Sequence, residues 1–141
     1  MGEKMSKVTI PARLERLHDV FEFVDGFMKN AQISAELQGK IKLAVEEIFV
    51  NIASYAYPNG HDNDDVTVRL SVDSGRLTVE FRDSGTPYNP LTKPDPDTSL
   101  SVAERGIGGF GVYFVKSIMD SVEYRYENGR NILITAKDLV Q

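Results

Sequence analysis

The segment VTVRLSVDSGRLTVEFRD, residues 66–83, decides the fold class because its two halves alternate apolar and polar residues on either side of a short turn. Alternation with a period of two places every second side chain on one face of a strand, as a half-buried strand requires. The residues between the halves, Asp73, Ser74 and Gly75, are typical of turns. We therefore predict an antiparallel β-hairpin whose one face packs against a core.

A second hairpin is predicted near the C-terminal end. The segments SVEYRYE (121–127) and RNILITAK (130–137) flank Asn128-Gly129, a pair that strongly favours a two-residue hairpin turn. Near the other end, KVTIPA (7–12) predicts an opening strand that Pro11 stops. These strands together indicate a mostly antiparallel mixed sheet.

Three segments have helical patterns. Residues 13–29 carry apolar residues at helical spacing, and Ser34 is the expected N-cap of a long helix through Tyr57, before Pro58. GVYFVKSIMD (111–120) is predicted to form a short apolar helix. The order is strand, two helices, hairpin, long loop, helix and hairpin. Because helices are segregated from an antiparallel sheet, we predict an α+β, two-layer α/β sandwich with helices on one face.

Composition narrows the function. A chain of 141 residues with 41% hydrophobic and 26% charged residues suits a single globular domain, 1–141. A net charge of −5 without a basic cluster argues against direct nucleic-acid binding. No apolar run reaches membrane-spanning length, so we expect a cytoplasmic protein with no membrane partner. The absence of cysteine excludes disulfides and thiolate sites, and the distant His18 and His61 do not suggest a zinc site.

The long helix carries a polar pair beside its apolar face. Glu47 and Asn51 are four residues apart, next to the stripe Ile41, Val45, Ile48, Ile52 and Ala56. A carboxamide oxygen suits Mg²⁺, which usually keeps several waters and binds phosphate oxygens. A carboxylate one turn away could accept a proton from a neighbouring hydroxyl. A solvated helix side is the alternative interpretation of this pair taken alone.

The end of the first hairpin offers an acceptor. In RDSGTP (82–87), Asp83 stands where the strand stops, and Gly85 would let the backbone approach a flat ligand. An adenine amino group is one donor that this aspartate could bind. An ordinary polar turn is the alternative.

A glycine-rich segment precedes the last helix. In RGIGGFGVYFVKSIMD (105–120), backbone N–H groups at a helix N-terminus could bind phosphate, and Arg105 could contact the terminal phosphate. The glycines also match a dinucleotide fingerprint, but that motif should follow a strand and open a parallel βαβ unit. Here it follows a proline-rich loop from Ser84 to Gly109. Long loops of this kind are often functional lids.

Taken in order, these three segments resemble the N box and the two glycine-rich G boxes of the GHKL ATPases, the superfamily of gyrase B, MutL and sensor histidine kinases. The lid PYNPLTKPDPDTSL and the following ERGIGGFGVYFVKSIMDSVEYRYENGRNILI are similar to the RsbW-like branch, the bacterial anti-sigma factor serine kinases. The resemblance runs from the opening strand to Lys137. It implies a Bergerat-type ATP-binding fold.

The resemblance also implies roles for the site residues. ATP and Mg²⁺ are the implied cofactors, with Asn51 as the metal ligand, Glu47 as the catalytic base and Asp83, beside Gly85, as the adenine-binding carboxylate. Gly108, Gly109 and Gly111 match the phosphate-binding glycines of the family, and the same glycine-rich segment adds Arg105 and Gly106 as candidate nucleotide-binding residues. Several family members place a threonine beside the last-strand glycine. Here Arg130 and Asn131 follow Gly129, which leaves that adenine contact open.

The implied activity is transfer of the γ-phosphoryl group of ATP to a serine or threonine of an anti-anti-sigma partner with a STAS domain. A sigma factor and a second copy of the chain are further partners that the resemblance suggests. The alternative is an ATP-binding regulatory module that binds partners without phosphotransfer.

Overall fold

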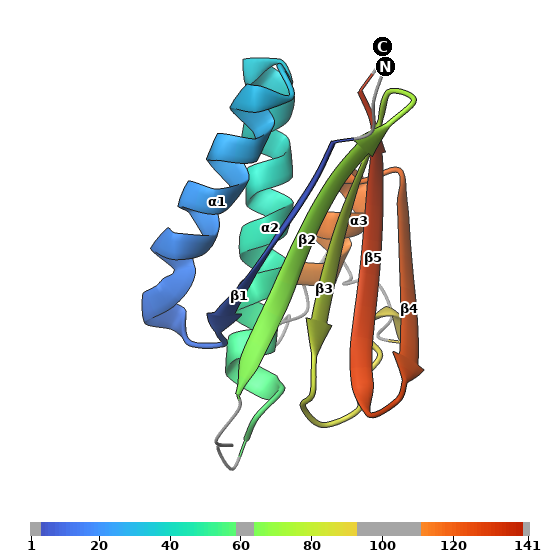
Figure 1. Ribbon diagram of the computed structural model, residues 1–141. Helices are drawn as coiled ribbons and strands as arrows, with labels where there is room; N and C mark the ends of the chain where they lie inside the picture. The colour runs from blue at the N-terminus through green and yellow to red at the C-terminus, as the bar shows by residue number, and fades with distance from the viewer. Residues whose placement is uncertain (1–3, 59–63, 93–110, 140–141) are drawn as a thin grey trace, which may run out of the picture.

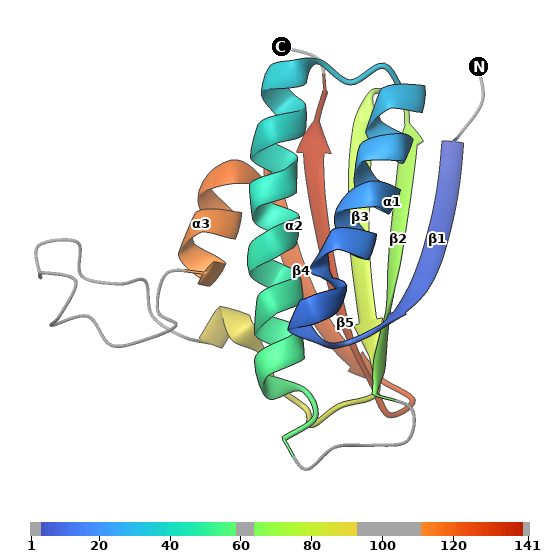
Figure 2. The same cartoon turned by 90° about the vertical axis from the view of Figure 1, so that its left-hand side faces the viewer.

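The computed structural model describes residues 4–58, 64–92 and 111–139. It has two layers, a five-stranded sheet and helices that cover one of its faces (Figures 1 and 2). The elements are β1 (Lys4–Pro11), α1 (Leu17–Asn30), α2 (Ala35–Tyr55), β2 (Asp65–Asp73), β3 (Arg76–Asp83), α3 (Gly111–Ile118), β4 (Ser121–Glu127) and β5 (Arg130–Asp138), with short 3₁₀ turns at Leu14–Arg16 and Pro90–Thr92. The predicted α+β sandwich is confirmed.

The strand order is β1-β2-β3-β5-β4, and each neighbouring pair is antiparallel. The sheet is therefore more uniform over the described strands than the mixed sheet that the sequence suggested. Both predicted hairpins form. Their turns have positive φ at both central residues, 54° and 75° at Ser74-Gly75 and again at Asn128-Gly129. This is the backbone that matches the twist of a two-residue hairpin.

The helices begin close to where the sequence places them. The Ser34 hydroxyl accepts a 3.3 Å hydrogen bond from the Leu37 amide, which confirms the predicted N-cap of α2. The first predicted helix instead opens as a 3₁₀ turn before α1, and β1 starts three residues earlier than expected. No helix within the described ranges is long and apolar enough to cross a membrane.

The core lies between α1, α2 and the helix-facing side of the sheet. Inward residues alternate along β2 and β3, and α1 and α2 each contribute one apolar stripe. The largest fully buried side chains include Met28, Ile41, Phe49, Leu70, Leu77 and Phe81. This packing holds α2 rigidly across the sheet, so its polar side chains are presented from a fixed scaffold.

Three chain segments meet at the C-terminal end of α2. The Tyr57 hydroxyl donates to the Asp65 carbonyl at 2.7 Å, at the start of β2, and accepts from the Ser84 amide at 2.8 Å, just after β3. Burial raises the pKa of Tyr57 to about 12, which keeps the hydroxyl protonated. These contacts fix the end of α2 against the segment that follows β3.

Candidate functional site

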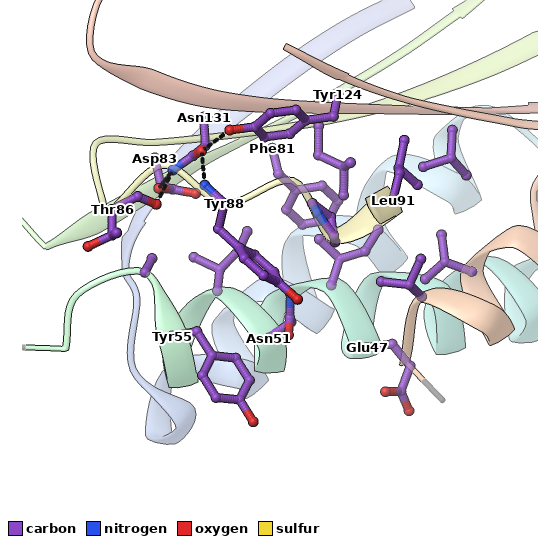
Figure 3. Close-up of a pocket in the computed structure, with 18 residues that line it drawn as sticks. Glu47, Asn51, Tyr55, Phe81, Asp83, Thr86, Tyr88, Leu91, Tyr124 and Asn131 are labelled. Carbon is purple, nitrogen blue, oxygen red and sulfur yellow. Dashed lines mark hydrogen bonds between the residues drawn. The ribbon is translucent and has the colours of Figure 1, made fainter. Parts of the chain in front are cut away.

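A pocket lies between the C-terminal half of α2 and the strands β3, β4 and β5 (Figure 3). Its remaining wall comes from the segment after β3 and from α3. Glu47, Asn51 and Asp83, which the sequence places in separate motifs, all line this one pocket. Arg105, Gly106, Gly108 and Gly109 lie outside the described residues, as does most of the predicted lid.

Asp83 stands at the polar end of the pocket. It ends β3, pairs with Asn131 of β5 and is only 6% exposed. Its Oδ1 accepts from the Gly85 amide and from Asn131 Nδ2, both at 2.9 Å. Desolvation raises the pKa of Asp83, while these two hydrogen bonds oppose that rise. Neither bond uses Oδ2, so the second oxygen has the capacity to accept a donor from a ligand.

Gly85 is required for packing against the end of α2. A Cβ built on it would lie 2.2 Å from the Ala56 carbonyl oxygen, and the next amide, of Thr86, donates to that same oxygen at 2.8 Å. The missing side chain therefore lets the segment after β3 dock on the end of α2. The approach of a flat ligand to Gly85, expected from the sequence, stays a prediction.

Asn131 of β5 links β3 and β4 to the segment that follows β3. It is 8% exposed, donates to Asp83 and accepts hydrogen bonds from the Tyr88 amide and the Tyr124 hydroxyl (Figure 3). Burial raises the pKa of Tyr124. From the sequence, the role of Asn131 stayed open and neither tyrosine was a candidate site residue. The period-two alternation of SVEYRYE was the one signal that could have placed Tyr124 on an inward face.

Aromatic and aliphatic side chains form the rest of the wall. Tyr88 lies between the Asp83–Asn131 pair and Asn51 of α2 in Figure 3, and Phe81 and Leu91 lie beyond it. An apolar pocket with a few polar groups at one end is the usual form of a site for a flat, partly polar molecule.

Glu47 and Asn51 are one helical turn apart on α2. Of the two, Glu47 lies farther from Asp83 (Figure 3). Partial burial, and then the neighbouring Glu46, raise the pKa of Glu47. Figure 3 shows its carboxylate directed away from the pocket interior. α2 thus contributes two polar groups to the pocket: the Asn51 carboxamide toward the polar end and the Glu47 carboxylate at the rim.

The donor set fits Mg²⁺ only together with a phosphate ligand. The described part of the chain contains no group of three or more His, Cys, Asp or Glu side chains that could hold a metal. A carboxamide oxygen can serve as one magnesium ligand when waters and phosphate oxygens supply the others. α3 begins at Gly111, and its Val112 and Val115 line the pocket, so the first turns of this helix border the site.

The chain is similar in sequence to a known domain family and to named kinases. The family model described as "Histidine kinase-like ATPase domain" matches residues 10–137. A serine-protein kinase RsbW of Listeria monocytogenes serotype 4a (strain HCC23) is 27% identical over 141 residues, covering 96% of this chain and 89% of that protein. The serine-protein kinase RsbW of Bacillus mycoides (strain KBAB4) is 26% identical, with 96% and 87% covered.

Solved structures show the same fold. A crystal structure of the RsbU and RsbW domains of Rv1364c from Mycobacterium tuberculosis superimposes with a TM-score of 0.70 at 11% identity, covering 98% of this chain and 33% of that one. The blue-light activated histidine kinase EL346 of Erythrobacter litoralis gives a TM-score of 0.55 at 20% identity, covering 76% and 32%. The resemblance inferred from the three sequence boxes is confirmed.

Proposed function

The chain belongs to the histidine kinase-like ATPase domain family, and from this premise we propose that it is an ATP-dependent protein serine/threonine kinase of the anti-sigma factor type. One observation carries the proposal: Asp83, Asn51 and Glu47, from two distant motifs, line a single pocket. The names of the RsbW relatives support phosphotransfer to serine.

Asp83 is the residue that we assign to the base of ATP. Its free carboxylate oxygen would accept a hydrogen bond from the adenine amino group, while Phe81, Tyr88 and Leu91 would cover the apolar ring. The carboxylate is preoriented because its other oxygen is already bonded to Gly85 and Asn131.

The phosphates would extend along α2 toward α3. Asn51 would hold Mg²⁺, which when bound neutralises phosphate charge. The N-terminal end of α3 at Gly111 would face the phosphates, and Arg105, Gly106, Gly108 and Gly109 are assigned to the same group by their sequence position.

Glu47 is assigned as the general base of the phosphotransfer reaction. Its carboxylate would take the proton from the acceptor hydroxyl as that oxygen bonds to the γ-phosphorus and ADP leaves. A rim position suits a base that must meet a hydroxyl carried by another protein. The partner proposed is a STAS-domain anti-anti-sigma protein, and a sigma factor and a second copy of the chain are further proposed partners.

A second candidate is an ATP-binding regulatory module without phosphotransfer. The outward direction of the Glu47 carboxylate favours it, because a base must turn toward the reacting hydroxyl. Phosphotransfer therefore requires this half-buried side chain to rotate toward the acceptor hydroxyl, and side-chain rotation is fast compared with a catalytic turnover.

The test is incubation of the purified chain with γ-labelled ATP, Mg²⁺ and STAS-domain proteins from the same genome. We expect label on a serine or threonine of one partner, and loss of transfer in Asn51→Ala. ATP binding by calorimetry with no labelled partner would favour the regulatory module. If calorimetry detects no ATP binding, both candidates are wrong.

A further inference from the structure

The side chain of Asn131 has no donor left for a ligand. One N–H bonds to Asp83 Oδ1 at 2.9 Å, and the other lies 3.0 Å from the Thr86 carbonyl, with the Gly85 carbonyl at 3.4 Å. A carboxamide has only two N–H groups. Both are therefore used within the protein.

The acceptor side of Asn131 is equally engaged. Its Oδ1 accepts from the Tyr88 backbone amide at 3.1 Å and from the Tyr124 hydroxyl. Because a backbone amide can only donate and a carbonyl can only accept, these neighbours allow a single orientation of the carboxamide. The Asn131 carboxamide is thus buried, and all of its hydrogen-bonding groups are used within the protein. It contacts the Asp83 carboxylate but has no donor or acceptor left for the adenine ring.

We propose that Asn131 is a positioning residue that sets the selectivity of this pocket for a 6-aminopurine over a 6-oxopurine, by holding the Asp83 carboxylate ionised and in one orientation. This inference rests on the proposed function, because it takes Asp83 as the base contact. It assigns to Asn131 a role that acts through Asp83 and not through direct contact with the nucleotide.

The chemistry of the two purines explains the selectivity. An ionised carboxylate only accepts hydrogen bonds, so it attracts a 6-amino group and repels a 6-oxo group. A protonated carboxyl could donate to the 6-oxo group, and a rotated carboxylate would no longer face the 6-amino group. Either change would reduce this discrimination. Burial favours the protonated form by raising the pKa of Asp83, and the Asn131 donor opposes this shift.

The test compares Asn131→Thr with Asn131→Val. The two replacements have the same shape and suit a strand. Only threonine carries a hydroxyl, which can replace the carboxamide as a hydrogen-bond donor to Asp83. Calorimetry gives the Kd ratio of GTP to ATP for each. We expect the ratio to fall by about tenfold or more in Asn131→Val, which corresponds to about 1.4 kcal/mol, and to stay near the wild-type ratio in Asn131→Thr.

Thr135→Val is the matched control. Thr135 is also buried on β5, and its hydroxyl donates to the β3 carbonyl of Val79 at 3.1 Å, outside the residues that line the pocket. This variant loses one hydrogen bond between the same two strands. We expect a lower melting temperature and an unchanged GTP-to-ATP ratio.

A pH series separates positioning from simple structural support. ATP affinity should fall on acidification as Asp83 takes up a proton, and the fall should begin at higher pH in Asn131→Val than in Asn131→Thr. The pKa values of Tyr57 and Tyr124, which both interact with the Asp83 charge, are raised, so these two hydroxyls stay neutral. Tyr88 also lies beside the Asp83–Asn131 pair and is unchanged in every variant. Titration of the nucleotide phosphate and of Glu47 is common to all variants and cancels.

The outcomes separate the inference from the proposed function. Wild type that binds neither nucleotide overturns both. Wild type that prefers ATP, with the same ratio and the same pH dependence in Asn131→Val, overturns the inference alone. If Asn131→Val does not fold, Asn131→Ser and Asn131→Ala provide the same comparison with less bulk, and equal ratios in these two would also overturn it.

Discussion

Gly85 lies against the last turn of α2, where any β-carbon on it would stand 2.2 Å from the Ala56 carbonyl oxygen. Gly85→Ala must therefore push the segment after β3 off the helix and disturb the Thr86–Ala56 hydrogen bond. We expect a loss of unfolding free energy of about 1–3 kcal/mol, the usual cost of overpacking. Urea unfolding followed by circular dichroism measures it. ATP affinity should fall as well, because Gly85 also donates to Asp83.

Gly39 provides the matched control for this substitution. It lies inside α2, and a Cβ there would meet nothing within 4 Å. Gly39→Ala should raise the unfolding free energy by about 0.5–1 kcal/mol, because alanine is the better helix former. Equal stability changes in the two variants would mean that the close contact at Gly85 does not exist in solution.

Asp83→Asn should stabilise the protein in the absence of nucleotide at neutral pH. The asparagine oxygen can keep the bonds from Gly85 and Asn131, while the cost of burying a charge disappears. Because the folded pKa of Asp83 is raised above its ordinary 3.8, wild-type stability falls as pH rises through that pKa, and the variant lacks this fall. The advantage of the variant should therefore vanish below the ordinary pKa. Urea titrations at several pH values measure this difference.

The same variant should respond poorly to nucleotide. ATP with Mg²⁺ should raise the melting temperature of the wild type, since a ligand that binds only the folded state stabilises it. The shift should shrink in Asp83→Asn, because an amide NH₂ would face the adenine amino group. An Asp83→Asn protein that keeps the full ATP shift would contradict the role assigned to Asp83.

Local sequence signals predicted the fold well, for physical reasons. Turn pairs such as Asn128-Gly129 specify a hairpin because they adopt backbone angles that few other residues adopt. Three or four consecutive residues are therefore enough to predict that two strands form a hairpin. The N-cap at Ser34 and the pairing of Glu47 with Asn51 on one helix side depend on residues within one or two turns. Such short-range rules need no knowledge of the rest of the chain.

The parts that sequence reasoning missed depend on contacts between distant segments. Asn131 meets Asp83 because β5 inserts between β3 and β4, which no local pattern reveals. Tyr88 reaches the pocket because Gly85 lets its segment dock on α2. In both cases the side chain acquires its role only once the strand order is known.

The direction and environment of Glu47 make its role testable through pH. If Glu47 is the base, Glu47→Gln should keep ATP affinity while phosphotransfer to the STAS partner falls by about 10²–10⁴-fold, the usual contribution of a general base. The base must be ionised, so the wild-type rate should rise with pH through the raised pKa of Glu47. Single-turnover transfer of labelled phosphate, measured across this pH range, reports both effects.

Glu46 supplies the control, because it is one residue away and therefore about 100° around the helix. Glu46→Gln should transfer phosphate at the wild-type rate at neutral pH. Its negative charge is one of the two causes that raise the pKa of Glu47, so its removal lowers that pKa and should move the acid limb of the rate profile to lower pH. A Glu47→Gln protein as active as Glu46→Gln would remove Glu47 from the mechanism. An acid limb that stays in place in Glu46→Gln would show that another group titrates in that limb.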